Sequence, residues 1–321
     1  DAWERTEGIP GLVGALLRGE PLEGALEARL AALQDEARRV YLALALLESP
    51  DPALVRRALE LDAPTMARAL ESLLAAGLTD IRGQPRAATA ARALVGAHPP
   101  SAELALRLAR LLPPLAAYPL YAQARLLWEE ADQRAARESA LAWATELLRR
   151  GSPLRAAEVL ERAGESAQVA LLRARALERA GRFREALGVL GERAEEPALL
   201  ALKGALHWRL GKPEAAREAA LGALGGDLET RAEALTTLGH LARSEGDLEA
   251  AEGYSRRAAA LWHSLGQSAR HGEALNNLAV TLSLRGEEAG AIFGAALEAS
   301  GENPLARATV LLNFGWTHER A

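Results

Sequence analysis

Apolar side chains recur along this chain at helical spacing, and glycines interrupt them at regular intervals. Five times a small residue is followed seven positions later by a glycine and five further on by an alanine. The turn glycines lie 30, 30, 35 and 40 residues apart. Such a period predicts a stack of helical hairpins, so we expect an all-α fold with one minor β-hairpin. The five instances are Ala144/Gly151/Ala156, Ala174/Gly181/Ala186, Gly204/Gly211/Ala216, Gly239/Gly246/Ala251 and Ala279/Gly286/Ala291.

The small residues have a steric role in this pattern. Leu235, Leu238 and Gly239 fall on one helical face, Gly246 ends that helix, and Ala251 lies on the inner face of the next. Large side chains at Gly239 and Ala251 would push the two antiparallel helices apart, because protein interiors are densely packed. We therefore expect close helix contacts at the small positions.

These five units resemble tetratricopeptide repeats (TPRs) over residues 137–300. A sixth unit begins at Leu311, Phe314 and Gly315, and its turn glycine would be residue 322, so we expect the natural protein to continue. The array is assigned to residues 137–321, as five repeats and a truncated sixth. Its last repeats, through 261–279, resemble the long-period repeats of signal-regulated ATPases and of transcription activators of the maltose-regulon type.

A second informative segment lies at the N-terminus. Thr6, Gly8 and Pro10 form a Thr-x-Gly-x-Pro pattern. It is similar to the end of the nucleotide-binding core in STAND ATPases (signal-transduction ATPases with numerous domains), in which the proline packs against adenine. The resemblance implies that Pro10 contacts the adenine and that residues 1–22 are the helical tail of a nucleotide-binding module. The alternative is that Pro10 simply starts a helix, where proline is tolerated in the first turn.

The next segment reads as a winged-helix domain over residues 23–98. Gly77 caps the third helix, and residues 78–83 and 86–95 are expected to form the hairpin. A winged helix directly follows the Gly-x-Pro segment in STAND proteins. Its third helix offers only Arg68, so we expect a coupling role and DNA contact only through a domain outside this chain. The predicted helices are 34–48, 51–60 and 63–76.

Residues 99–136 connect the two halves. We expect helices over 101–112 and 120–134, separated by Pro113, Pro114 and Pro119, because proline and the residue before it disfavour helix. They are interpreted as an atypical hairpin that caps the array.

Composition narrows the class of protein. The net charge is −5, and the only lysines are Lys203 and Lys212, which argues against a chain that binds nucleic acid electrostatically. Cysteine is absent, which excludes disulfides, thiolate zinc sites and cysteine nucleophiles. No apolar run is long enough to cross a bilayer, and no signal peptide is visible, so a cytoplasmic protein without a membrane partner is expected.

Catalytic signatures are missing from the sequence. There is no Gly-x-x-x-x-Gly-Lys-[Ser/Thr] loop, so the resemblance implies that the phosphate-binding loop lies upstream of Asp1 and that ATP or ADP would bind only to the full-length protein. No hydrolase elbow or metalloprotease motif occurs. His263 and His271 are interpreted as surface residues, too far apart to share a metal. We expect neither an enzyme nor a metal or cofactor site here.

The first helix of each TPR hairpin lines the concave side of the array, so repeat position predicts a ligand groove. Its amide, guanidinium and indole groups suit a peptide, a partner protein or a small polar inducer. The alternative for Trp208 and Trp316 is a packing role. The predicted groove residues are Arg175, Trp208, His240, Arg243, Asn276, Asn277 and Trp316.

Together these features predict the signal-sensing part of a STAND-type transcriptional regulator. In that hypothesis the winged helix couples the nucleotide state of an upstream domain to the repeat array. The alternative is a stand-alone TPR scaffold that binds a peptide and has no connection to nucleotide. An enzyme is the third and least favoured class.

Overall fold

The computed structural model describes residues 6, 9–19, 21–86, 90, 100–191 and 195–319 of the chain. All regular elements in these ranges are helices. One isolated β-bridge is also present. Two compact units are present, Asp1–Glu146 and Leu147–Ala321, and helix α10 (Glu130–Arg149) contains the junction between them.

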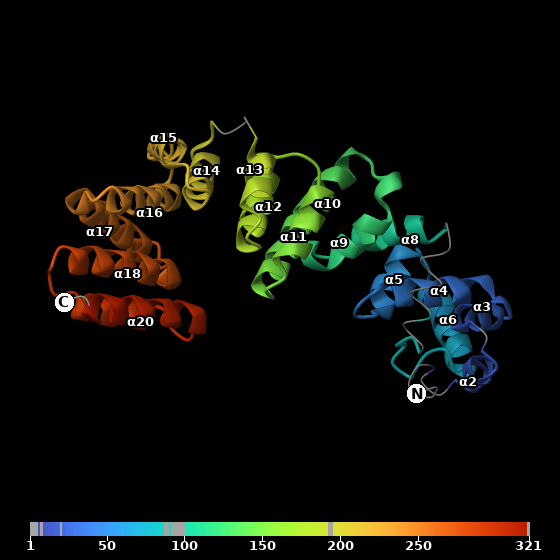
Figure 1. Cartoon of the computed structure of the whole chain (residues 1–321). Coiled ribbons are helices and arrows are strands. Elements are labelled where there is room, and N and C mark those ends of the chain that lie inside the picture. The colour runs from blue at the N-terminus through green and yellow to red at the C-terminus, as the bar shows by residue number, and fades with distance from the viewer. Residues whose placement is uncertain are drawn as a thin grey trace. The chain divides into compact units, whose positions relative to one another are not determined.

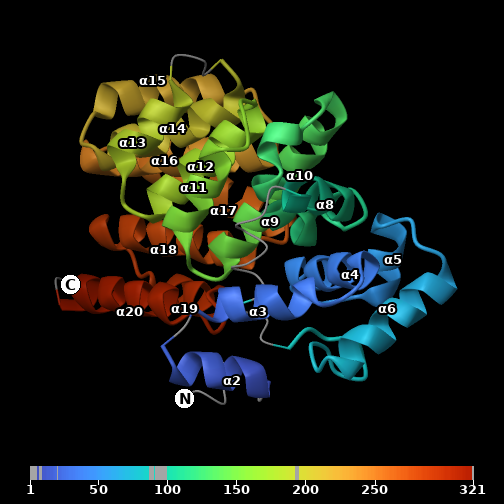
Figure 2. The ribbon, with the colours of Figure 1, turned by 90° about the vertical axis from the view of Figure 1, so that its right-hand side faces the viewer.

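The first unit is built on an apolar cluster around Tyr41 and Leu73, both fully buried. Helix α4 packs against α5, α6 and α8, while α2 packs against α3 (Figure 2). The helices predicted over 34–48, 51–60 and 63–76 are observed as α4, α5 and α6. The described helices that precede α10 are α2 (Pro10–Leu17), α3 (Leu22–Ala31), α4 (Asp35–Leu46), α5 (Pro52–Ala58), α6 (Ala63–Ala75), α8 (Pro100–Ala109), α9 (Pro114–Gln123) and the 3₁₀ turn η1 (Arg125–Leu127).

A tight turn follows α6. Gly77 ends the helix with φ +69°, a left-handed conformation that glycine adopts without a steric penalty. The hairpin that follows is reduced to one antiparallel bridge between Thr79 and Pro85. The Asp80 carboxylate accepts hydrogen bonds from the backbone N–H groups of Arg82 and Gln84, both at 2.8 Å, which tightens the turn. The returning segment predicted at 86–95 lies mostly outside the described residues.

The prediction for the connecting helices was wrong at Pro119. Helix α9 continues through this proline, and the helix predicted at 120–134 is instead broken by η1, with α10 starting at Glu130. Burial of Ala117, Leu120 and Tyr121 on one side of α9 offsets the hydrogen bond that proline cannot donate.

The second unit is a series of antiparallel helical hairpins (Figure 1). The five turn glycines all have positive φ, between +69° and +82°, which confirms that they end the first helix of each hairpin. We call the first helices A. The A helix of the Gly151 hairpin is α10, and the A helices that lie wholly within the second unit are α12 (Ala167–Arg179), α14 (Pro197–Arg209), α16 (Leu228–Ser244), α18 (Ser268–Leu284) and α20 (Pro304–Glu319), of which α20 has no B partner among the described residues. The second helices are called B: α11 (Pro153–Glu161), α13 (Phe183–Leu190), α15 (Pro213–Ala223), α17 (Leu248–Ser264) and α19 (Gly290–Ala299).

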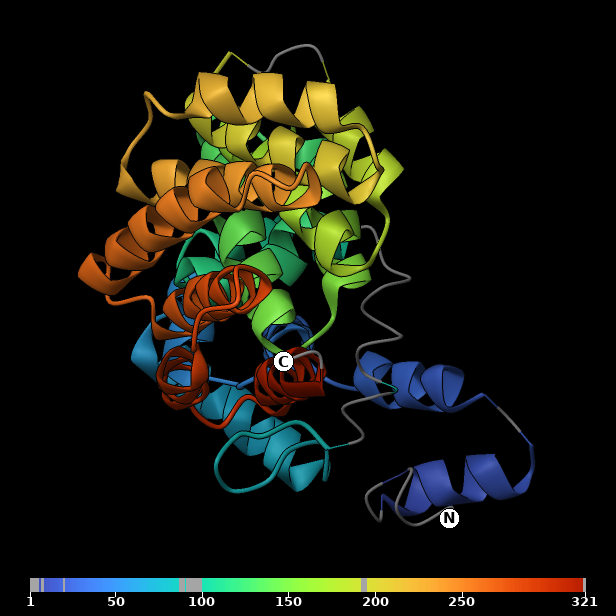
Figure 3. The ribbon, with the colours of Figure 1, turned by 60° about the vertical axis from the view of Figure 1, so that its left-hand side comes forward.

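The A helices form a continuous row. The A helices α12, α14, α16 and α18 each pack against their B partner, and each also contacts the next A helix, as far as α20. Figure 3 shows the ribbon from another side. Among the described residues, no two successive B helices make a comparably extensive contact. A stack of hairpins whose A helices contact one another while its B helices are spread apart must curve toward the A helices. The A helices therefore line the concave face. This is a TPR-like helical repeat, as predicted.

Close contacts at small residues set the hairpin spacing. A Cβ added to Gly204 would lie 3.2 Å from the carbonyl oxygen of Ala216 and 3.2 Å from the backbone nitrogen of Ala220. Gly239 faces Ser255 and Ala251 in the same way. The last instance of the pattern is wrong, because Ala291 is exposed.

The reason for this error lies where α19 begins. Residues 287–289 are not helical, so the helix starts only at Gly290. This shifts the inner face, and Ala289 and Phe293 are buried there in place of Ala291.

Gly204→Leu is expected to destabilise the chain by roughly 1–3 kcal/mol, because backbone atoms of α15 would have to move to admit the side chain. Gly253→Leu is the matched control, since Gly253 lies within α17 with nothing within 4 Å of an added Cβ. That change should be neutral or stabilising by up to about 0.8 kcal/mol through helix propensity. Urea unfolding followed by circular dichroism measures both, and equal effects would contradict the close-contact argument.

Candidate functional site

The concave face carries a stripe of polar side chains along α16. Glu229, Glu233, His240 and Arg243 are separated by four, seven and three residues, which places them on one face of the helix. Their partners lie on α12, α14 and α18, so this face is directed toward the other A helices. The stripe is acidic in the first turns and basic in the last, the order that the helix dipole favours.

Trp208 and His240 are stacked on this face, near the ends of α14 and α16. Their ring centroids lie 5.9 Å apart with an interplanar angle of 9°, and both side chains are half-buried. Burial lowers the pKa of His240 to about 4, and the positive charges of Arg243 and Arg209 act in the same direction. The imidazole is therefore neutral at pH 7.

Arg243 continues the same patch toward α18. Its Nη2 donates to Nδ1 of His240 at 2.9 Å, and its Nη1 donates to the backbone oxygen of Asn277 at 3.3 Å. Burial lowers the pKa of this guanidinium from its ordinary value. Trp208, His240, Arg243 and Asn277 are thus brought together, and we call these four residues the Trp208 patch.

Arg175 is placed differently from the prediction of a ligand-binding residue. Its guanidinium on α12 binds the Glu233 carboxylate on α16 at 2.9 and 3.1 Å and lies 3.6 Å from Glu229. The bond spans two repeats and passes over α14, so it braces the curvature of the array. Burial raises the pKa of Glu233, and the charges of Arg175 and Arg270 oppose this rise.

The other predicted residues lie apart from the patch. Asn276 is buried, and its Oδ1 accepts from Nδ2 of Asn313 on α20 at 3.2 Å, so it joins two A helices. Trp316 on α20 is 44% exposed. Pro10 begins α2, but its side chain and all of Gly8 lie outside the described residues, so the adenine contact stays a prediction.

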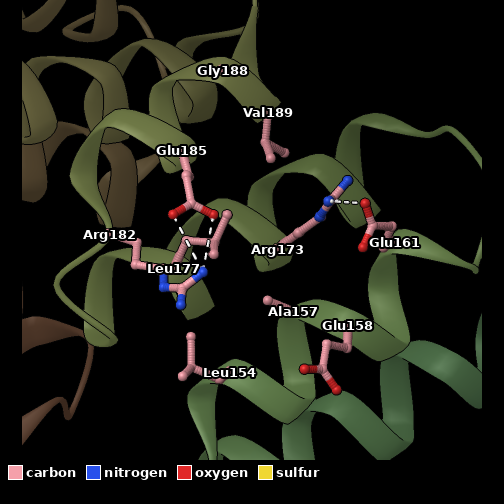
Figure 4. A pocket seen from close by; sticks show the side chains of 10 residues that line it. All are labelled: Leu154, Ala157, Glu158, Glu161, Arg173, Leu177, Arg182, Glu185, Gly188 and Val189. Carbon is pink, nitrogen blue, oxygen red and sulfur yellow. Dashed lines mark hydrogen bonds and ion pairs between the residues drawn. The ribbon is translucent and has the colours of Figure 1, made fainter.

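A separate pocket of about 450 Å³ lies between α11, α12 and α13 (Figure 4). Its arginines are paired within the pocket itself: Arg173 with Glu161 at 2.8 Å, and Arg182 with Glu185 at 3.3 Å. Leu154, Ala157, Leu177 and Val189 supply its apolar lining. Sequence reasoning missed this pocket, because its residues share no repeat position.

The prediction that His263 and His271 lie far apart was wrong. The rings of His263 and His271 lie 5.0 Å apart, because the turn between α17 and α18 folds one residue against the other. Within the described part of the chain, however, no three His, Asp or Glu residues are arranged to hold a metal ion. The described residues also include no helix that is both long and apolar enough to cross a membrane.

Glu229, Glu233, Arg209 and Arg270 are residues of the concave face that the sequence reasoning did not name. Helical spacing from His240 is enough to find the two glutamates. Arg270 lies 5.9 Å above the Trp262 ring, and the carboxylates of Glu273, Glu233 and Glu178 raise its pKa against the effect of burial.

Comparisons with known proteins give structural similarity only. No family profile and no curated protein matches the chain. A solved STAND protein with a tetratricopeptide repeat sensor from Pyrococcus horikoshii is 16% identical, with a TM-score of 0.43. The match covers 99% of this chain and 57% of that one, so this chain spans little more than half of its length. The APC/C hetero-tetramer Cut9–Hcn1 is 12% identical over 97% of this chain and 76% of that one, with a TM-score of 0.36. Similarity this low assigns no activity.

Acid is expected to destabilise the fold through His240. Between pH 6.5 and about 4 the unfolded chain binds a proton that the folded imidazole does not, so stability is lost as the pH falls through this window. The loss should approach roughly 2 kcal/mol at pH 4.5. Urea unfolding at pH 7 and 4.5 should show that His240→Gln removes this part of the pH dependence. His263→Gln, at an exposed histidine, should retain it; identical pH profiles for the two variants would refute the assignment.

Arg175→Gln should cost roughly 1–3 kcal/mol of unfolding free energy, because it leaves the largely buried Glu233 carboxylate without its charged hydrogen-bond donor. The double variant Arg175→Gln with Glu233→Gln should recover part of the loss. Arg182→Gln, which breaks an exposed pair with Glu185, is the control and should cost at most about 1 kcal/mol. If the free-energy changes of Arg175→Gln and Glu233→Gln simply add in the double variant, the ion pair between Arg175 and Glu233 contributes nothing to stability.

Proposed function

We propose that this chain is the signal-sensing part of a STAND-type, ATP-dependent transcriptional regulator whose concave face binds an inducer or a partner protein. The observation that carries the binding role is the Trp208 patch, in which an aromatic ring, an imidazole and a guanidinium meet on the inner side of a curved helical array. Such a combination suits recognition of a polar ligand.

Binding is favoured over catalysis by the chemistry of the patch. Its titratable groups are His240, whose pKa of about 4 makes it a weak base at pH 7, and an arginine. A general base works best with a pKa near the operating pH. The patch therefore offers recognition groups without an efficient proton acceptor.

The regulatory part of the proposal rests on the first unit. A Thr-x-Gly-x-Pro segment precedes three helices and a one-bridge hairpin, in the order expected for a STAND winged helix. A ligand on the array would act by binding one state of the full protein more tightly than another. The alternative is a TPR scaffold that binds a peptide without any link to nucleotide.

Binding can be tested on the chain itself. Peptide and small-molecule fractions of extract from the source organism are added to the purified chain, and the active fraction should raise its melting temperature. A ligand at one hundred times its Kd stabilises by about 2.7 kcal/mol. Trp208→Ala should abolish the shift, while the control Leu221→Ala, at an exposed position on α15, should retain it.

Two outcomes would contradict the proposal. A shift that survives Trp208→Ala would place the ligand elsewhere, for example in the pocket between α11 and α13. A full-length gene with no phosphate-binding loop upstream of Asp1 would remove the STAND assignment and favour the scaffold.

A further inference from the structure

Arg243 differs from neighbouring arginines because it has no carboxylate partner among the described residues. Arg175 is paired with Glu233, Arg217 with Glu245, and Arg285 with Glu252 and Glu287. Among the described residues, no ion pair includes Arg243. Its two hydrogen-bond partners, His240 and a backbone carbonyl, are neutral acceptors.

A partly desolvated charge without a counter-charge is costly. Carboxylates or bound anions normally compensate buried guanidinium groups, and charge-assisted bonds to an oxyanion are stronger than bonds to neutral oxygen. The neutral acceptors orient the Arg243 fork but leave its charge unbalanced. Such residual cost is common where a site is built for a ligand and not for stability.

Two groups of α14, Trp208 and Arg209, also act on the His240 imidazole. Arg209, at the end of α14, is exposed, has no ion pair among the described residues, and is close enough to His240 to lower its pKa. Trp208, the residue before it, presents its ring beside the same imidazole. The Arg243 guanidinium and the Trp208 indole therefore both contact the His240 ring, at one point of the concave face, in a chain whose net charge is −5.

We propose that this point is an oxyanion subsite, formed by Arg243, for a carboxylate or phosphate group of a ligand whose body lies against Trp208. The inference rests on the proposed function of the concave face and adds the charge of its ligand. The acidic half of the α16 stripe is paired with Arg175 and repels anions, so the subsite is confined to the last turns of α14 and α16.

The test uses the whole chain and three small probes of similar shape: benzoate, phenyl phosphate and the neutral benzamide. Tryptophan fluorescence and calorimetry should show at least one anion binding about tenfold more tightly than benzamide. Arg243→Gln should remove that preference, and Arg243→Lys should retain part of it. Arg285→Gln, at an arginine with its own carboxylate partners, should leave the preference intact. The tighter of the two anions identifies the group as carboxylate or phosphate.

Stability supplies a second readout. Without an anion, Arg243→Gln should raise the melting temperature, because it removes an uncompensated charge. If Arg243 had only a structural role, the same substitution would lower the melting temperature. Benzamide binding as tightly as both anions, no probe binding at 10 mM or below, or a lower melting temperature in Arg243→Gln would overturn the subsite. The extract experiment with Trp208→Ala would still decide separately whether the concave face binds a ligand. Anion binding without any active extract fraction would keep the subsite and reject the proposed function.

Discussion

The close approach of antiparallel helices at small residues is the constraint on which the second unit depends. Backbone atoms of α15 lie 3.2 Å from where a Cβ on Gly204 would be, so α14 and α15 approach each other closely at this point. Left-handed glycines then reverse the chain within a few residues. Closely packed hairpins let each A helix contact the next, and that continuous row creates the concave face.

Curvature brings together residues that the sequence keeps far apart. Arg175 and Glu233 are 58 positions apart, yet they form an ion pair between α12 and α16, in which Nη2 of Arg175 donates to both carboxylate oxygens. The pairing needs both the helix face on which each residue lies and the angle between repeats. The helix face can be predicted from sequence, because helical periodicity shows which residues share a face. The angle between repeats depends on packing at every helix interface from α12 to α16, which the sequence pattern does not give.

The same distinction explains which predictions hold. Glycine spacing predicted the hairpins, since a left-handed turn strongly prefers glycine, but it missed the register of α19, where Ala289 and Phe293 replace Ala291. Repeat position placed Trp208, His240 and Arg243 on one face. It also placed Asn276 there, whereas packing against Asn313 buries that amide. The pocket between α11, α12 and α13 has no sequence signal, because three helices contribute to it at unrelated positions.

Electrostatics divides the concave face into two parts with different roles. Near the start of α16 the Glu233 carboxylate is paired with Arg175 on α12 and lies in the field of Arg270 on α18. The negative charge is therefore compensated within the protein, and the ion pair links two repeats. Near the end of α16 the imidazole is held neutral and the guanidinium has only neutral partners. Both parts lie on one helix face, two turns apart. Because the brace holds that helix in place, movement between repeats would alter the separation of Trp208 and Arg243, and the geometry of any ligand site there is tied to the curvature of the array.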